Sequence, residues 1–305
     1  MIKVDDIAFV RFSAPDLDKM EAFLTDFGLA RAHRDGATLY MRGEGGDPFV
    51  HVTHLGEPGF KGVAFRARSA DDLTKLAKST DAKVEALDGP GGGNVVRLKD
   101  LDGFNVEVVA GREAQAPAAI PPAPLTNDAR AQPRRNATKR VSQGASHIKR
   151  LGHCVLNVSN FRASEAWYKE HFGFITSDEI KMSPEFALGA FMRCDRGEEP
   201  ADHHTLFMLG TGQPKFNHAA FEVVDMDDLM SGHDVLKEKG HEAQWGVGRH
   251  ILGGQIFDYW RDPWGHVLEH WTDGDLMTAS WGSRDATPQD LIGVQWGMKM
   301  PANMG

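Results

Sequence analysis

The sequence predicts an α+β fold of four βαβββ modules, paired into two domains that each curl a mixed sheet around a cavity. The main observation is that residues 1–110 and 147–275 share motifs at matched spacing. A second is that each half contains two similar strand–helix–three-strand units, so we place modules near residues 5–53, 60–109, 150–210 and 215–271. Repeats indicate architecture because each unit buries its apolar face against its neighbours.

The composition permits two domains of ordinary size and excludes several classes of protein. The chain has 305 residues, of which 41% are hydrophobic, so it can bury two cores. Its net charge of -9 argues against a nucleic-acid partner. No run of roughly 18 apolar residues predicts a membrane span, and the N-terminus lacks the pattern of a signal peptide. The two cysteines, Cys154 and Cys194, suit a reducing cytoplasm, where we expect the protein.

Each half begins with an apolar strand followed by a helix that ends at a glycine. The strands lie at residues 7–10 and 152–156, and the helices end near Gly28 and Gly173. Glycine ends helices readily because it adopts the left-handed conformation at little cost. From Ala8 to Gly28 and from His153 to Gly173 the spacing is 20 residues, which aligns the two halves.

Two further matches complete the alignment of the halves. Residues 62–65 and 70–73 parallel residues 218–221 and 226–229 as a strand followed by a helix start. Each half then closes with an Asp-x-x-Gly element, which predicts a hairpin turn feeding a terminal strand.

Two segments fall outside the repeat. Residues 111–146 combine a Pro/Ala-rich stretch with a basic, polar run, which predicts an extended, solvated linker. Residues 276–305 form a C-terminal tail containing Trp281 and Trp296. The tail could pack over a pocket mouth or form a subunit contact, and the sequence leaves both open.

The aligned halves differ at two of three equivalent positions. Ala8 and Gly62 in the first half correspond to His153 and His218 in the second, whereas Glu107 and Glu269 match. The second half therefore holds two imidazoles and one carboxylate on strands that the repeat places close together. This set leaves open coordination positions on a metal and suits Fe(II), with Mn(II) as the usual competitor. We expect a metal centre in the second half, and an N-terminal domain without one.

Further polar residues lie near these positions in sequence. His203 and His204 are adjacent, so strand alternation would let only one face the metal. His250 lies in an expected turn before a strand, and Tyr259 lies within a strand. A histidine can exchange protons near neutral pH, and a tyrosine can hydrogen-bond an anionic oxygen. Cys154 should point away from the metal into the core.

These motifs resemble those of type I extradiol ring-cleaving dioxygenases of the vicinal oxygen chelate (glyoxalase/bleomycin resistance) superfamily, which includes catechol 2,3-dioxygenases and biphenyl-2,3-diol 1,2-dioxygenases. The resemblance rests on residues 152–156, 203–205, 217–221 and 250–269. In such enzymes a histidine, a tyrosine and a glutamate follow one another at steps of nine and ten. Here His250, Tyr259 and Glu269 have those same spacings.

The resemblance implies an Fe(II)-dependent enzyme that opens a catechol ring with O2 in aromatic catabolism, Mn(II) being possible. It implies that His153, His218 and Glu269 bind the metal. It also implies that His204 exchanges protons with the substrate, and that His250 and Tyr259 hydrogen-bond substrate and oxygen. The histidine–threonine order favours His204 over His203. The partners would be a catechol and O2, and the chain would form a homo-oligomer.

Two other functions fit the same fold. One is a glyoxalase-like metal-dependent isomerase or lyase, and the other is a metal-free small-molecule binding module. The substrate's substituents also stay open. Arg193 and Arg249 could bind a carboxylate bidentately. Near the motifs are further residues that could line the pocket: Phe191, Met192, Trp245 and Ile251.

Overall fold

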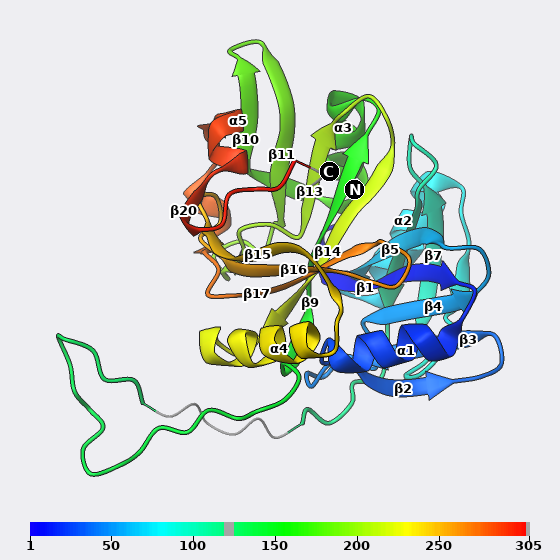
Figure 1. Cartoon of the computed structure of the whole chain (residues 1–305). Coiled ribbons are helices and arrows are strands. Elements are labelled where there is room, and N and C mark those ends of the chain that lie inside the picture. The colour runs from blue at the N-terminus through cyan, green and yellow to red at the C-terminus, as the bar shows by residue number, and fades with distance from the viewer. Residues whose placement is uncertain (119–124, 303–305) are drawn as a thin grey trace.

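The computed structural model describes residues 1–118 and 125–302, and it contains the four predicted modules (Figure 1). The first half forms one eight-stranded sheet with two helices. Its elements are β1 (Val4–Ala14), α1 (Leu17–Asp26), β2 (Ala30–Arg34), β3 (Thr38–Arg42), β4 (His51–Leu55), β5 (Gly59–Ala67), α2 (Ala70–Thr80), β6 (Val84–Ala86), β7 (Asn94–Lys99) and β8 (Asn105–Ala110).

The second half repeats this order and adds a structured tail. Its modules comprise β9 (Ile148–Val158), α3 (Phe161–Phe172), β10 (Phe174–Ser183), β11 (Phe186–Cys194), β12 (Ala201–Asp202), β13 (Leu206–Gly210), β14 (Lys215–Val223), α4 (Met226–Glu238), β15 (Glu242–His250), β16 (Ile256–Arg261) and β17 (Val267–Thr272). The tail comprises β18 (Leu276–Met277), the 3-10 helix η1 (Ala279–Trp281), β19 (Arg284–Ala286), α5 (Pro288–Ile292) and β20 (Val294–Gly297).

The four module helices begin in the same way. A polar side chain at each N-cap accepts a hydrogen bond from the backbone N–H three residues later, and these caps are Asp16, Ser69, Asn160 and Asp225. Such caps satisfy backbone donors that the first helical turn leaves free. Helix α3 ends at Gly173, whose φ of 70° is left-handed, as the repeat predicts.

The two sheets have the same strand order, which confirms the predicted pairing of modules. In the first sheet the order is β2-β3-β4-β1-β5-β8-β7-β6, and the core of the second is β10-β11-β13-β9-β14-β17-β16-β15. In each sheet the first strands of two modules pair antiparallel at the centre, β1 with β5 and β9 with β14. The closing strand of the second module, β8 or β17, then pairs parallel with its own first strand.

The tail continues the second sheet at both of its edges. Strand β19 pairs with β10 at one edge, and β20 pairs with β15 at the other. Helix α5 lies between these two strands in sequence, so the tail connects the two edges of the curled sheet. In Figure 1 this red segment lies beside β10, β11 and β15.

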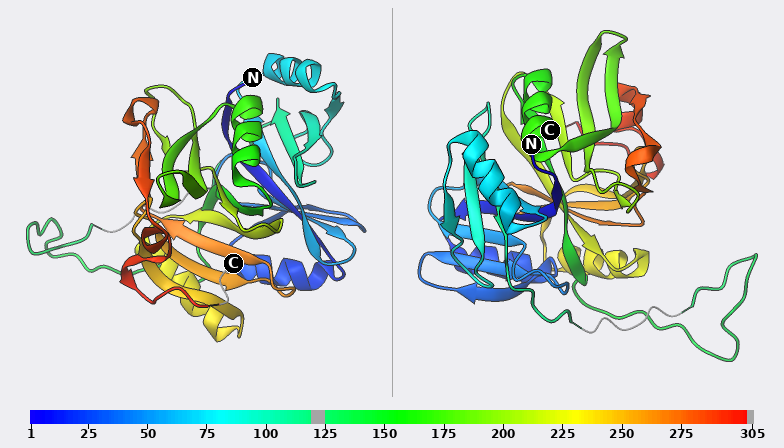
Figure 2. Two further views of the ribbon diagram at one scale, coloured as in Figure 1. Left: turned by 90° about the horizontal axis from the view of Figure 1, so that it is seen from above. Right: turned by 180° about the vertical axis from the view of Figure 1, so that it is seen from behind.

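The segment between the sheets has no helix or strand where the structure describes it, at residues 111–118 and 125–146. Part of the predicted Pro/Ala-rich linker, residues 119–124, lies outside the described residues. Figure 2 shows residues 125–140 running away from both sheets, consistent with the expected extended linker. Among the described residues, no helix is long and apolar enough to cross a membrane.

Candidate metal centre

Strand register brings His153, His218 and Glu269 together. Ala220 on β14 pairs with His153 on β9 and with Glu269 on β17, so these two side chains flank the same position. His218 lies two residues before Ala220 and therefore points to the same face of the sheet. One potential ligand atom from each residue lies within 4.8 Å of the others, and all three residues are buried.

The geometry around Glu269 fits a bound metal ion. Its Oε2 lies 3.3 Å from His153 Nε2 and 3.2 Å from His218 Nε2. Ligands placed about 2.1 Å from a common ion at right angles lie about 3 Å apart. Neither carboxylate oxygen of Glu269 has a well-aligned hydrogen bond to any part of the chain that the structure describes. A buried carboxylate without donors requires a cation, and these residues can hold one.

Asn217, for which the sequence predicted no role, also supports a cation beside Glu269. Its Oδ1 lies 2.8 Å from His218 Nδ1, and its Nδ2 donates to Asn157 Oδ1 at 3.2 Å. The amide oxygen can only accept, so His218 carries its proton on Nδ1 and presents a lone pair from Nε2 toward Glu269. A lone pair facing a carboxylate is repulsive unless a cation lies between them. Partners of this kind orient metal-binding histidines in other proteins.

The electrostatics of the cluster agree with its geometry. Burial acts to raise the pKa of Glu269, but the neighbouring imidazoles of His153, His218 and His250 hold that pKa well below its usual range. Burial lowers the pKa of His153, although Glu269 opposes the shift. The carboxylate is thus charged and the His153 imidazole tends to be neutral, which are the forms that bind metals.

His204 lines the pocket beside the three residues, whereas His203 lies behind it. The ring centroids of His204 and His153 are 3.9 Å apart. His203 is fully buried, and its Nε2 lies 2.7 Å from Asp178 Oδ2. Its Nδ1 lies 3.1 Å from Nδ1 of His204. The expected strand is wrong here, because residues 203–205 are irregular and β13 begins at Leu206.

The contact between the two histidines restricts their proton positions. The carboxylate of Asp178 accepts, so His203 donates through Nε2. When His203 is neutral, its Nδ1 is an acceptor and Nδ1 of His204 carries the proton. The Nε2 of His204 then keeps a free lone pair. Asp178 comes from β10, with no motif near it, so sequence reasoning missed it.

His250 and Tyr259 occupy another wall of the pocket. His250 is the last residue of β15 rather than part of the turn expected there. Its Nε2 lies 2.9 Å from the Tyr259 hydroxyl. Tyr259 pairs across the sheet with Glu269, and burial together with that carboxylate raises its pKa well above the usual value. Tyr259 therefore stays a neutral phenol that can donate a hydrogen bond.

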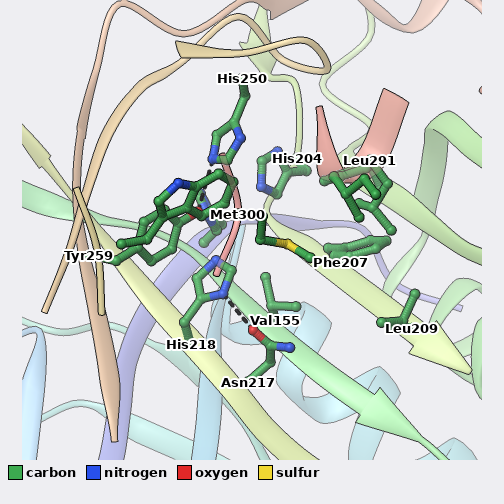
Figure 3. Close-up of a pocket in the computed structure, with 14 residues that line it drawn as sticks. Val155, His204, Phe207, Leu209, Asn217, His218, His250, Tyr259, Leu291 and Met300 are labelled. Carbon is green, nitrogen blue, oxygen red and sulfur yellow. Dashed lines mark hydrogen bonds between the residues drawn. The ribbon is translucent and has the colours of Figure 1, made fainter. Parts of the chain in front are cut away.

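The pocket itself is mostly apolar (Figure 3). Phe191 and Trp245 line it as the sequence suggested, and so do the tail residues Leu291, Ile292 and Met300. Fourteen residues line it in all, the others being His153, Val155, His204, Phe207, Leu209, Asn217, His218, His250 and Tyr259. Met192 belongs to the main core, as does Cys154, which lies away from the pocket. Ile251 is 40% exposed and is not part of the lining.

In the first half an arginine lies beside the corresponding carboxylate. Glu107, the counterpart of Glu269, receives hydrogen bonds from Arg11 Nε at 3.1 and 3.0 Å. The strand register makes Phe9, rather than the expected Ala8, the counterpart of His153, and Phe9 packs in a buried cluster with Tyr40 and Phe49. The guanidinium thus balances the charge of this carboxylate.

Comparison with known proteins agrees with this geometry. Residues 150–270 match the family model of the Glyoxalase/Bleomycin resistance protein/Dioxygenase superfamily. The chain carries a domain of this superfamily. The matched range contains the three clustered residues together with His204, His250 and Tyr259.

Curated proteins that are similar to this chain align with it beyond residues 150–270. The chain is 30% identical over 204 residues to metapyrocatechase 2 of Cupriavidus necator, an alignment covering 66% of the chain and 60% of that relative. It is 27% identical over 278 residues to the manganese-dependent 2,3-dihydroxybiphenyl 1,2-dioxygenase of Geobacillus genomosp. 3, covering 86% of the chain and 83% of that relative. The chain thus spans about three fifths of the first relative and most of the second.

The fold is shared along nearly the whole chain with the Mn(II)-bound glyoxalase from Novosphingobium aromaticivorans. The TM-score is 0.81 at 24% identity, covering 99% of this chain and 94% of that one. This likeness shows that the two proteins share one fold over both halves of the chain.

Proposed function

We propose that this chain is a metal-dependent extradiol dioxygenase, which uses O2 to open a catechol ring beside its paired hydroxyls. The observation that carries the proposal is one mostly apolar pocket, lined by the two histidines of a His-His-Glu cluster, by a histidine with a free lone pair and by a neutral tyrosine. In the reaction both oxygen atoms enter the product, and the bond between a hydroxylated ring carbon and its unhydroxylated neighbour breaks. The names of the curated relatives, metapyrocatechase and 2,3-dihydroxybiphenyl 1,2-dioxygenase, support this reaction class.

His153, His218 and Glu269 would hold the metal, Fe(II) in our proposal with Mn(II) as the alternative. When bound, the ion supplies a Lewis-acid and redox centre where the catechol oxygens and O2 meet. Asn217 keeps the His218 lone pair turned toward that centre. All three residues are buried, so the ion would lie at the inner end of the pocket.

His204 would act as the base that accepts a proton from a catechol hydroxyl through Nε2, and later return it as the ring opens. The hydrogen bonds that link His204 to His203 and His203 to Asp178 hold that lone pair toward the pocket. On the other wall, Tyr259 and His250 would hydrogen-bond the oxygen atoms of the substrate.

The proposal is tested by purifying the protein anaerobically with Fe(II) and measuring O2 uptake with catechol, 3-methylcatechol and 2,3-dihydroxybiphenyl. We expect one O2 consumed per ring and a yellow ring-opened product. A glyoxalase-like isomerase would bind metal without consuming O2, and a binding module would hold no stoichiometric metal. No uptake by protein shown to contain Fe(II) contradicts the proposal.

We further propose that the chain forms a homo-oligomer in the cytoplasm. Its large exposed apolar side chains, which include Phe186, Leu276 and Trp281, are consistent with a subunit contact. Light scattering of the purified protein tests the assembly, and a monomeric mass contradicts it.

A further inference from the structure

The pocket offers few polar groups, and none of them carries a fixed charge. Six polar residues line it, and they are His153, His204, Asn217, His218, His250 and Tyr259. Asn217 uses its amide on His218 and Asn157, and Tyr259 pairs with His250. None of the residues that line the pocket is Lys, Arg, Asp or Glu. A charged group on a substrate would find no counterion among them.

The two arginines that the sequence offered for a substrate carboxylate are engaged elsewhere. Arg193 is buried and donates to the backbone oxygens of residues 176, 278 and 282 and to the Ser177 hydroxyl. Arg249 donates to the Gly254 oxygen and pairs with Asp273 at 2.8 Å. Neither lines the pocket.

The C-terminal tail supplies part of the apolar wall. Leu291 packs against the buried cluster that includes Phe191 and Phe207, and Met300 packs against the one that includes Trp245 and Tyr259. Figure 3 labels Leu291 near Phe207 and His204, on the opposite side of the view from Tyr259. Because β19 and β20 are each paired with an edge of the sheet, the residues between them are held over the pocket.

Resting on the proposed function, we infer that the ring substituent of the catechol is uncharged and apolar, such as an alkyl or aryl group, and that the tail residues Leu291, Ile292 and Met300 select it. A carboxylate placed against these walls loses its hydration and gains no partner. An alkyl or aryl group of the same size instead replaces water at an apolar surface, which is favourable.

A matched pair of substrates tests the inference. 4-Methylcatechol and 3,4-dihydroxybenzoate share the catechol and differ in the charge of one small substituent. We expect kcat/KM to be at least about 100-fold lower for the carboxylate. Equal values for the pair overturn the inference while leaving ring cleavage standing.

Binding measured without turnover separates this inference from the proposed function. Calorimetry of metal-loaded protein under anaerobic conditions gives the affinity for each diol whether or not the ring opens. Tighter binding of 4-methylcatechol supports the inference even if no O2 is consumed. Equal or tighter binding of the carboxylate overturns it.

A charge placed on the tail provides a second test. Leu291→Arg puts a guanidinium on the pocket side of α5, and Gln289→Arg puts the same charge on an exposed position of that helix. We expect Leu291→Arg to shift the kcat/KM ratio toward the carboxylate by at least about tenfold, with metal content unchanged. Gln289→Arg should leave the ratio as it is. The same ratio in both variants contradicts a selecting role for the tail.

Discussion

Two glutamates at equivalent positions have different counterions. Glu107 pairs with Arg11, at 3.0 Å from Nη2, whereas Glu269 faces two imidazole nitrogens at 3.2 and 3.3 Å. Both side chains are at least 90% buried, so each needs a positive charge nearby. The chain meets that need with a guanidinium in one half, and we propose a metal ion in the other.

This difference predicts the metal stoichiometry. Glu269→Gln should lower Fe(II) affinity by more than about 100-fold, because it removes a charged ligand rather than an outer partner. Glu107→Gln is the matched control, since it changes the same residue type at the equivalent position and should keep one metal per chain. Metal analysis after dialysis against a weak chelator measures both. Stoichiometric metal in Glu269→Gln would show that the ligand assignment is wrong.

The pair formed by His203 and Asp178 predicts an effect on turnover. Burial acts to raise the pKa of Asp178, but His203 and Arg284 together hold it below its usual value, so its carboxylate is charged. Asp178→Asn should lower kcat about 10- to 100-fold without changing metal content, because an amide can donate to His203 and reverse the proton positions.

Arg284→Gln serves as the control for this variant. Its Nε lies 3.3 Å from Asp178 Oδ1, but half of its side chain is exposed, so it should change kcat little. Steady-state kinetics at saturating diol compare the two variants. An unchanged kcat in Asp178→Asn would leave His203 as a packing residue only.

At the scale of elements, the Asp-x-x-Gly turns fix where the closing strands β8 and β17 begin. Asp262 Oδ1 accepts hydrogen bonds from the backbone N–H groups of residues 264 and 266, at 2.8 and 2.9 Å. Asp100 makes the same bonds to residues 102 and 104 in the first half. The turn before β17 thereby fixes the start of the strand that carries Glu269.

Removing that side chain should loosen the turn. Asp262→Ala leaves two backbone donors without their acceptor in a partly buried turn, which should cost about 1–3 kcal/mol of unfolding free energy. Asp273→Ala, at a mostly exposed carboxylate, should cost much less. Chemical denaturation of the two variants gives the comparison. Equal stability would mean that the strand pairing alone holds this turn.

The modules could be predicted from the sequence because their signals are local. Helix caps, glycine ends and Asp-x-x-Gly turns recur at fixed spacing, and the repeat aligned His218 and Glu269 with their counterparts. It placed the counterpart of His153 one residue too early, because the strand register makes Phe9, not Ala8, equivalent to His153. The pairing of β19 and β20 could not be predicted, since those short strands have no pattern of their own and depend on the sheet edges that receive them. Asp178 was missed for a related reason, because only the folded sheet brings it to His203.

At the scale of the whole molecule, charged residues join the two sheets. Arg150 on β9 pairs with Asp202 and Glu222 at 2.7 and 2.6 Å, and lies 3.8 Å from Asp6 on β1. His270 on β17 also contacts the backbone oxygen of Phe27 at 2.7 Å. The halves are therefore coupled through polar contacts, and the stability of the molecule should respond to the ionisation of these groups.

Asp6 gives this coupling a pH dependence. Burial, with a further contribution from Asp202, raises its pKa to about 6, although Arg150 and Arg66 oppose the shift. The folded chain thus keeps a proton that the unfolded chain releases near pH 4. The contribution of this proton to the free energy of unfolding is fully present below about pH 4 and is lost as the pH rises through about 6. The loss is at most about 3 kcal/mol.

Asp6→Asn stays uncharged at every pH. The melting temperature of this variant minus that of the natural chain should therefore increase as the pH rises from 4.5 to 8. Asp5→Asn removes a more exposed neighbouring carboxylate and provides the control for the loss of one charge. Thermal unfolding of the three proteins across this range measures the difference. If the offset between Asp6→Asn and the natural chain is constant with pH, then Asp6 is ionised throughout the range, and the contact between the sheets is an ordinary ion pair.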